Sequence, residues 1–229
     1  MKKIIDFIPA LFLTLVFIVW TILVKTIDMS YILNVGYIGF SHFNFQVNDY
    51  VLEFGKTDLF NRLSDIGLYL SFLIVATFAV IGLVEWIKRK SIKKVDPIIF
   101  MLLAVYVTTV IEYFIFEIVK INYSPISTPE DLHASYPSSH VLLFITFFIT
   151  GLIALFTYVK AHKVIKYISL SLGGLVAIMY AAMRLLSGKH YFTDIVAGLF
   201  LSGSIIALFF GLMKTFNKVE DKQIENIEQ

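Results

Sequence analysis

The sequence predicts an all-α membrane protein: a bundle of six transmembrane helices, with an outer-side interfacial segment between the first and second helices. Two observations support this fold class. Of the 229 residues, 58% are hydrophobic, and the mean hydropathy of +0.82 is far above that of a soluble domain. The apolar residues also form six separate stretches, each about as long as a helix that crosses the hydrocarbon core of a bilayer.

Each predicted helix is an apolar stretch with almost no charged residues inside it. The first stretch ends at Lys25 and not at a small-residue cleavage site, so we expect a retained helix rather than a signal peptide. The six stretches are Ile4 to Val24, Ile66 to Trp86, Pro97 to Val119, Val141 to Val159, Tyr167 to Met183, and Ile195 to Met213.

The lysines and arginines indicate the orientation of the bundle. Thirteen of the 19 lie in the N-terminal segment or in the connections after the second, fourth and sixth stretches. By the positive-inside rule these segments and both termini are cytoplasmic, in a multi-pass protein of the cell membrane. The third-to-fourth and fifth-to-sixth connections then face outward. Any site that they form is extracytoplasmic.

Between the first two stretches, the segment from Asp28 to Asp65 is too polar to span the bilayer, but it is rich in aromatic residues. Tyr31, Tyr37 and Phe43 are examples. We expect it to lie along the outer interface, where it could line a route for a lipid. The alternative is an ordinary outer loop that its aromatic residues anchor.

Composition excludes several other classes of protein. There is no cysteine, so neither a disulfide framework nor a thiolate metal site is expected. A net charge of +2, with the basic residues at the ends of apolar stretches, argues against a nucleic-acid partner. No linker divides the chain, so residues 1–218 are predicted to form one domain, followed by a disordered cytoplasmic tail at 219–229.

A polar run precedes the sixth stretch. Arg184, His190 and Asp194 stand at fixed spacing between two apolar segments. A guanidinium can bind a phosphate, an imidazole can attack its phosphorus atom, and a carboxylate can orient that imidazole. The alternative is structural: Arg184 reaches to the interface, and His190 and Asp194 form a local ion pair.

A second polar cluster, Pro137-Ser138-Ser139-His140, precedes the fourth stretch. Such a helix start leaves backbone N–H groups unpaired, and these attract an anion. Ser139 is small enough for the backbone to approach a phosphate, and His140 could protonate a leaving oxygen. Alternatively, the cluster is simply a favourable helix start. Lys120, which ends the third stretch, is predicted to face the same side as both clusters.

These two clusters, on six predicted spans, resemble the type-2 phosphatidic acid phosphatase superfamily of membrane lipid phosphatases over about Ile66 to Met213. The resemblance implies that His190 is the nucleophile and forms a phosphohistidine, that Asp194 orients it, and that His140 is the general acid. It also implies that Arg184, Lys120, Ser138 and Ser139 bind the phosphate. The family usually has glycine where this chain has Ser139, and serine where it has Met183.

The first motif of the family is incomplete in this chain. The family has a lysine followed after six residues by Arg-Pro, and some bacterial members resemble a version with a shorter spacing. Neither spacing gives an arginine after Lys120 in this chain, where Ser124 or Ser127 stands instead. Removing one group that stabilises transition-state charge typically costs about 2.7 to 4 kcal/mol, or a rate factor of about 10² to 10³. Activity is therefore expected to be low unless another cation substitutes. Lys189 is the candidate, with a solvent-facing side chain as the alternative.

Two carboxylates lie in the outer half of the third stretch. Glu117 is expected to pair with Lys120, and Glu112 to pair with Arg184 or to face a polar cavity. No spacing of His, Asp and Glu indicates a metal cage, and the resemblance implies a reaction without metal or other cofactor. His133 is expected to be a solvated loop residue.

The predicted function is hydrolysis of a lipid phosphate or diphosphate at the outer surface of the membrane. The candidate substrates are undecaprenyl diphosphate, phosphatidic acid and phosphatidylglycerol phosphate. One alternative is a phosphotransferase that uses the same phosphohistidine. The other is a non-catalytic protein that binds or transports lipid phosphates, which the missing arginine favours but the retained His140, His190 and Asp194 do not.

Overall fold

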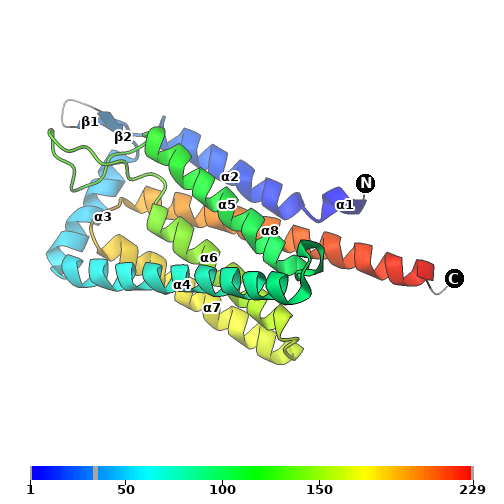
Figure 1. Ribbon diagram of the computed structural model, residues 1–229. Coiled ribbons are helices and arrows are strands. Elements are labelled where there is room, and N and C mark those ends of the chain that lie inside the picture. Colours follow the sequence, from blue (N-terminus) through cyan, green and yellow to red (C-terminus); the bar gives the residue numbers. More distant parts are fainter. Residues whose placement is uncertain (1, 33–35, 228–229) are drawn as a thin grey trace.

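The computed structural model describes residues 2–32 and 36–227, which form a long bundle of helices (Figure 1). In chain order the elements are α1 (Lys2–Ile5), α2 (Ile8–Val24), β1 (Ser30–Ile32), β2 (Gly36–Ile38), α3 (Ser41–Phe54), α4 (Thr57–Arg89), a 3₁₀ turn η1 (Ile92–Lys94), α5 (Pro97–Ile118), α6 (Ser139–Tyr158), α7 (Lys163–Leu186) and α8 (Phe192–Ile227).

Five helices of the described chain are long and apolar enough to cross a membrane. They are α4, α5, α6, α7 and residues Phe192–Phe216 of α8. The prediction of a mostly helical, multi-pass membrane protein is therefore confirmed. The helix at the position of the first predicted span, α2, is apolar but has only 17 residues, and it packs along α8.

Helix α4 begins well before the second predicted span. It starts at Thr57 and not near Ile66, and it runs for 33 residues. A hydropathy window marks only where apolar residues begin, whereas a helical backbone tolerates a polar first few turns. Asn61, Ser64 and Asp65 therefore lie on a helix and not in the predicted interfacial segment.

The rest of that segment is also regular. β1 and β2 form an antiparallel hairpin in which Ser30 pairs with Ile38. Helix α3 follows and ends at Gly55, whose φ of 68° is the left-handed conformation that terminates helices. Phe43, Tyr50 and Phe54 are exposed on α3.

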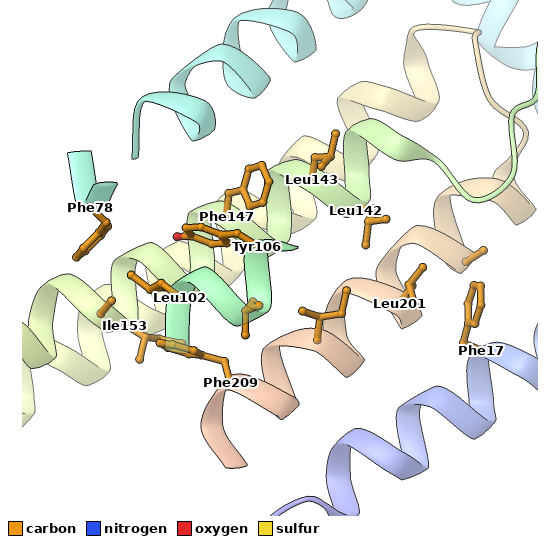
Figure 2. Close-up of a cluster of buried hydrophobic side chains, with 14 of the residues drawn as sticks. Phe17, Phe78, Leu102, Tyr106, Leu142, Leu143, Phe147, Ile153, Leu201 and Phe209 are labelled. Atoms are coloured by element: carbon orange, nitrogen blue, oxygen red, sulfur yellow. The ribbon is translucent and has the colours of Figure 1, made fainter. Parts of the chain in front are cut away.

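Helix α6 is the centre of the bundle and packs against α4, α5, α7 and α8. Its side chains meet those of α5 and α8 in an apolar core (Figure 2). Tyr106 and Phe147 lie edge to face there, with ring centroids 4.8 Å apart. At Gly198 of α8, a Cβ atom would lie 3.1 Å from the backbone oxygen of Ser138, so glycine allows α8 to approach the start of α6 closely.

The helix ends fall into two groups at opposite ends of the bundle. One group lies near the hairpin and α3, and it consists of the starts of α4, α6 and α8 and the ends of α5 and α7 (Figure 1). The other end of the bundle holds α1 and the last turns of α8. All residues of the three sequence motifs are thus at one end.

The expected domain limit at residue 218 is not marked by a break, because α8 continues to Ile227 through most of the tail that was predicted to be disordered.

Candidate active site

His190 is buried in the loop between α7 and α8, and its ring has two hydrogen-bond partners. Nδ1 lies 3.0 Å from the backbone oxygen of Ser135, and Nε2 lies 3.1 Å from Nη2 of Arg184. A carbonyl oxygen can only accept a hydrogen bond, and a guanidinium can only donate one. The proton is therefore on Nδ1, and Nε2 carries a lone pair.

The surroundings of His190 keep its ring neutral. Burial, aided by the positive charge of Arg184, lowers the pKa of His190 well below its ordinary value. Lys189, which is half-buried, acts in the same direction. A neutral imidazole whose Nε2 carries no proton is the form that can act as a nucleophile.

Arg184, near the end of α7, is also buried, and helix α4 holds its guanidinium. Nη1 donates to Oδ1 of Asn61 at 3.0 Å and to the hydroxyl of Ser64 at 3.3 Å. Its Nε–H is buried and has no hydrogen-bond partner among the described residues. An unpaired buried donor is unfavourable, so this edge of the guanidinium is suited to an anion beside Nε2 of His190.

Three residues of α4 that the sequence motifs did not identify belong to this cluster. Nε2 of His140 lies 3.1 Å from Oδ1 of Asp65, and Asn61 donates to the other oxygen of that carboxylate at 3.2 Å. The spacing of Asn61, Ser64 and Asp65 is i, i+3, i+4, which puts them on one face of a helix. This spacing could have indicated from the sequence that the three side chains lie together. It does so only if the residues are helical, and the sequence did not show that α4 begins at Thr57.

The second motif forms the start of α6. The backbone N–H of Ser138 donates to the backbone oxygen of Asp194 at 3.0 Å, which joins the second and third motifs. The hydroxyl of Ser138 is buried without a hydrogen-bond partner among the described residues, and Ser139 is half-buried. The first N–H groups of α6 have no carbonyl within the helix to pair with and carry the positive end of its dipole.

The predicted pairing of His190 with Asp194 is wrong. The Asp194 carboxylate is fully buried and accepts from the side-chain amide of Asn122 at 2.9 Å and from the backbone N–H of Tyr191 at 3.0 Å. An i, i+4 contact needs both residues on one helix, but α8 begins at Phe192 and leaves His190 in the preceding loop. The backbone oxygen of Ser135 takes the orienting position instead.

Asp194 is part of a buried polar network that joins α3 to α8. The side-chain amide of Asn44 donates to Oγ1 of Thr193 at 2.9 Å and to the backbone oxygen of Gly39 at 2.8 Å. Asn122 lies between these residues and Asp194. Helix α3 and the first-motif loop are thus held against the start of α8, next to the loop that carries His190.

The first-motif residues do not join His190 and Arg184. Lys120 is exposed just after α5 and has no ion pair in the part of the chain that the structure describes. Ser124 is buried and donates to the backbone oxygen of Lys189 at 2.7 Å, whereas Ser127 is half-buried and its hydroxyl contacts the backbone of His133. The loop is therefore anchored beside the third motif, but it brings no side-chain cation there.

A small cleft of about 20 Å³ reaches His190 from the side of α5, and Glu112, Glu117 and Ser139 contribute to its lining. The expected pairs of Glu112 with Arg184 and of Glu117 with Lys120 are not found in the described chain. Glu112 instead contributes to the lining of this cleft. His133 lies in the loop between α5 and α6, beside Asp131 at 3.0 Å.

No group of three or more His, Asp or Glu side chains among residues 2–32 and 36–227 is arranged to hold a metal ion. The cluster offers a different chemistry: one neutral imidazole with a lone pair, one guanidinium with a free edge, and a second imidazole paired with a carboxylate. These are the components of a nucleophile, an anion-binding site and a proton donor.

Comparisons with known proteins concern the fold and the sequence motifs. The fold is similar to the crystal structure of a transmembrane PAP2-type phosphatidylglycerolphosphate phosphatase from Bacillus subtilis, with a TM-score of 0.66 and 17% sequence identity over 92% of this chain and 97% of that chain. No curated protein matches the sequence. The model of the PAP2 superfamily, the family predicted from the motifs, matches residues 116–218, which include the second and third motifs. The predicted resemblance to this superfamily is therefore confirmed over these residues, and the similarity of the folds agrees with it.

Proposed function

We propose that this protein is a membrane phosphatase that hydrolyses a lipid phosphate or diphosphate through a phosphohistidine on His190. The observation that carries the proposal is the contact between His190 and Arg184. Nε2 carries no proton and accepts a hydrogen bond of 3.1 Å from Nη2 of a guanidinium whose Nε–H has no partner among the described residues. A phosphoryl group placed there would meet a nucleophile and its anion-binding donors together.

In the first step, Nε2 of His190 forms a bond to phosphorus while the bond from phosphorus to the lipid oxygen breaks. Arg184, Ser138, Ser139 and the first N–H groups of α6 stabilise the charge on the phosphoryl oxygens. His140 gives its proton to the departing oxygen. Positive charge that develops on His190 is delocalised toward Nδ1, whose hydrogen bond to Ser135 then strengthens.

In the second step, water attacks phosphorus and the bond to Nε2 breaks. His140, which lost its proton in the first step, takes one from the attacking water. Free phosphate and neutral His190 are restored. No metal or cofactor takes part in this sequence.

Asp194 has a positioning role in this proposal and does not contact the reacting ring. Its carboxylate holds the N–H of Tyr191, the residue after the nucleophile, and its backbone oxygen holds Ser138 at the start of α6. It therefore fixes the distance between the nucleophile loop and the phosphate-binding helix start. Lys120 lies at the same end of the bundle, where it could attract the headgroup, and half-buried Lys189 is the closer substitute for the missing arginine.

For the membrane arrangement, we propose six spans, with α2 as the first and the site on the extracytoplasmic side. A 17-residue helix is about 26 Å long, close to the hydrocarbon thickness of about 30 Å. The exposed aromatic residues of α3 would lie in the outer interface. The substrate candidates are undecaprenyl diphosphate, phosphatidic acid and phosphatidylglycerol phosphate, and the activity in the name of the similar Bacillus subtilis protein favours the last.

Release of inorganic phosphate from these three lipids by the detergent-purified protein tests the proposal. His190→Gln should abolish release, whereas His133→Gln, at an exposed loop histidine, should retain it. Release that persists in His190→Gln would exclude His190 as the nucleophile. Transfer of labelled phosphate to another acceptor without free phosphate would indicate a phosphotransferase, and binding without turnover would indicate a non-catalytic lipid-phosphate protein.

A further inference from the structure

We infer that Asp65 is a positioning residue for proton transfer: its carboxylate orients His140 and stabilises the protonated ring that the reaction needs. The inference rests on the proposed function, because it assigns a partner to the general acid of that reaction. It concerns α4, which lies outside the residues that match the superfamily model.

The contact determines which nitrogen of His140 faces the substrate. Oδ1 of Asp65 lies 3.1 Å from Nε2 of His140, and a carboxylate only accepts hydrogen bonds. Nε2 therefore keeps its proton, and Nδ1 is the nitrogen that exchanges a proton with the substrate. The side chains of His140 and Asp65 are 24% and 36% exposed, whereas His190 and Arg184 are buried. The pair is thus more accessible to water than the nucleophile is.

Asp65 is not simply the counter-ion of Arg184. Nη1 of Arg184 is 4.0 Å from the carboxylate and is directed instead to Oδ1 of Asn61 at 3.0 Å. Asn61 in turn donates from Nδ2 to Asp65 at 3.2 Å. The amide of Asn61 therefore separates the two charges: its oxygen faces the guanidinium and its nitrogen faces the carboxylate. The shortest polar contact of Asp65 is the one to His140.

This arrangement gives the two halves of the reaction a common support. One face of α4 holds Arg184 through Asn61 and Ser64, and holds His140 through Asp65. In the first step, cationic His140 transfers the proton on Nδ1 to the lipid oxygen as its bond to phosphorus breaks. In the second, Nδ1 takes a proton from water. The ring is cationic before the first transfer and after the second, and the carboxylate stabilises it both times.

The need for this acid depends on the leaving group. An alkoxide is strongly basic and requires a proton, whereas a nitrophenolate leaves without one. The test therefore compares two substrates in a single turnover: a lipid alkyl phosphate and an alkyl-substituted 4-nitrophenyl phosphate. The rate measured is that of phosphohistidine formation, in protein quenched with alkali because phosphohistidine is labile in acid.

General acid catalysis contributes about 10² to 10⁴ in rate. We expect Asp65→Asn to slow the alkyl substrate by about 10² and the nitrophenyl substrate by less than about fivefold. Asp58→Asn, an exposed aspartate in the first turn of α4, is the matched control and should change neither rate. The ratio of the two rates does not depend on the amount of folded enzyme, so partial misfolding of the variant leaves the test valid.

A double-mutant cycle checks that Asp65 acts through His140. If it does, Asp65→Asn should have little further effect on the alkyl substrate in a His140→Ala background. Equal slowing of both substrates by Asp65→Asn, or additive effects in the cycle, would overturn the inference. If wild-type protein forms no phosphohistidine from either substrate, it is the proposed function that fails, so the two failures are distinguishable.

Discussion

Arg184→Lys is the substitution that most directly separates charge from geometry at the proposed phosphate site. The variant keeps one positive charge but replaces a fork of fixed donors with a single ammonium on a shorter stem. It cannot maintain the contacts of Nη1 to Asn61 and of Nη2 to His190, at 3.0 and 3.1 Å, and still present the unpaired Nε–H to a phosphate. Both the support from α4 and the bidentate binding edge are lost.

The expected size of the effect follows from these contacts. Loss of one donor to transition-state charge costs about 2.7 to 4 kcal/mol, so kcat/KM should fall by about 10² to 10³. Hydrogen bonds to charged groups contribute about 1.5 to 3 kcal/mol each, so a smaller loss of stability should accompany it. Arg62→Lys, at an exposed arginine of α4, is the matched control and should stay within about twofold of wild type.

The assay is phosphate release from lipid phosphate in mixed micelles, with the lipid fraction varied to obtain kcat/KM. The melting temperature of each variant is measured in the same detergent. If Arg184→Lys kept more than about a tenth of the wild-type kcat/KM, a loss under 1.4 kcal/mol, the guanidinium fork would not be the phosphate-binding element. In that case a positive charge at this position, on either an ammonium or a guanidinium group, would be sufficient for phosphate binding.

Four further predictions concern stability, pH and the incomplete first motif. Asn122→Ala should destabilise the fold by about 1 to 3 kcal/mol, because it removes a hydrogen bond from the buried carboxylate of Asp194; an unchanged melting temperature would contradict this network. Burial lowers the pKa of His190 in the folded protein, so as the pH falls the histidine is protonated in the unfolded chain before it is protonated in the folded one. The free energy of unfolding should therefore decrease below about pH 6.5, by up to about 1.4 kcal/mol per pH unit. In His190→Gln the dependence of the melting temperature on pH should be weaker by this amount, and an equally steep profile would refute the assignment. Ser124→Arg should lower the melting temperature and Ser127→Arg should not, because only Ser124 is buried. Any gain in turnover from a restored arginine is therefore expected in Ser127→Arg, and a gain in Ser124→Arg alone would contradict this. Chelation with EDTA should leave phosphate release unchanged, and loss of activity that Mg²⁺ or Zn²⁺ restores would show a metal requirement.

Much of the fold follows from hydropathy and charge. The apolar stretches locate α4 to α8, and the distribution of lysines and arginines puts the ends that carry His140 and His190 on one side of the bundle. Residues 50 positions apart in the chain could therefore be expected to meet. Hydropathy fails at the polar start of α4, because it reports where side chains become apolar and not where the backbone becomes helical.

The same limits apply to the site. Motif spacing identified Arg184, His140 and His190, because their types and intervals are specific. It could not identify Asp65 and Asn61, which contact them from a helix that is distant in sequence. It also gave the wrong partner for His190, since a spacing of four residues implies contact only within one helix. A carbonyl group such as that of Ser135 has no sequence signature, because every residue carries one.

The most direct test of the account is identification of the covalent intermediate. The protein is mixed with a lipid phosphate labelled with ³²P, quenched with alkali within the first turnover, digested, and analysed by mass spectrometry. The account predicts labelled phosphohistidine at His190, which is absent from His190→Gln and present in His133→Gln. Turnover with no label on the protein, or label on His140 instead, would contradict it.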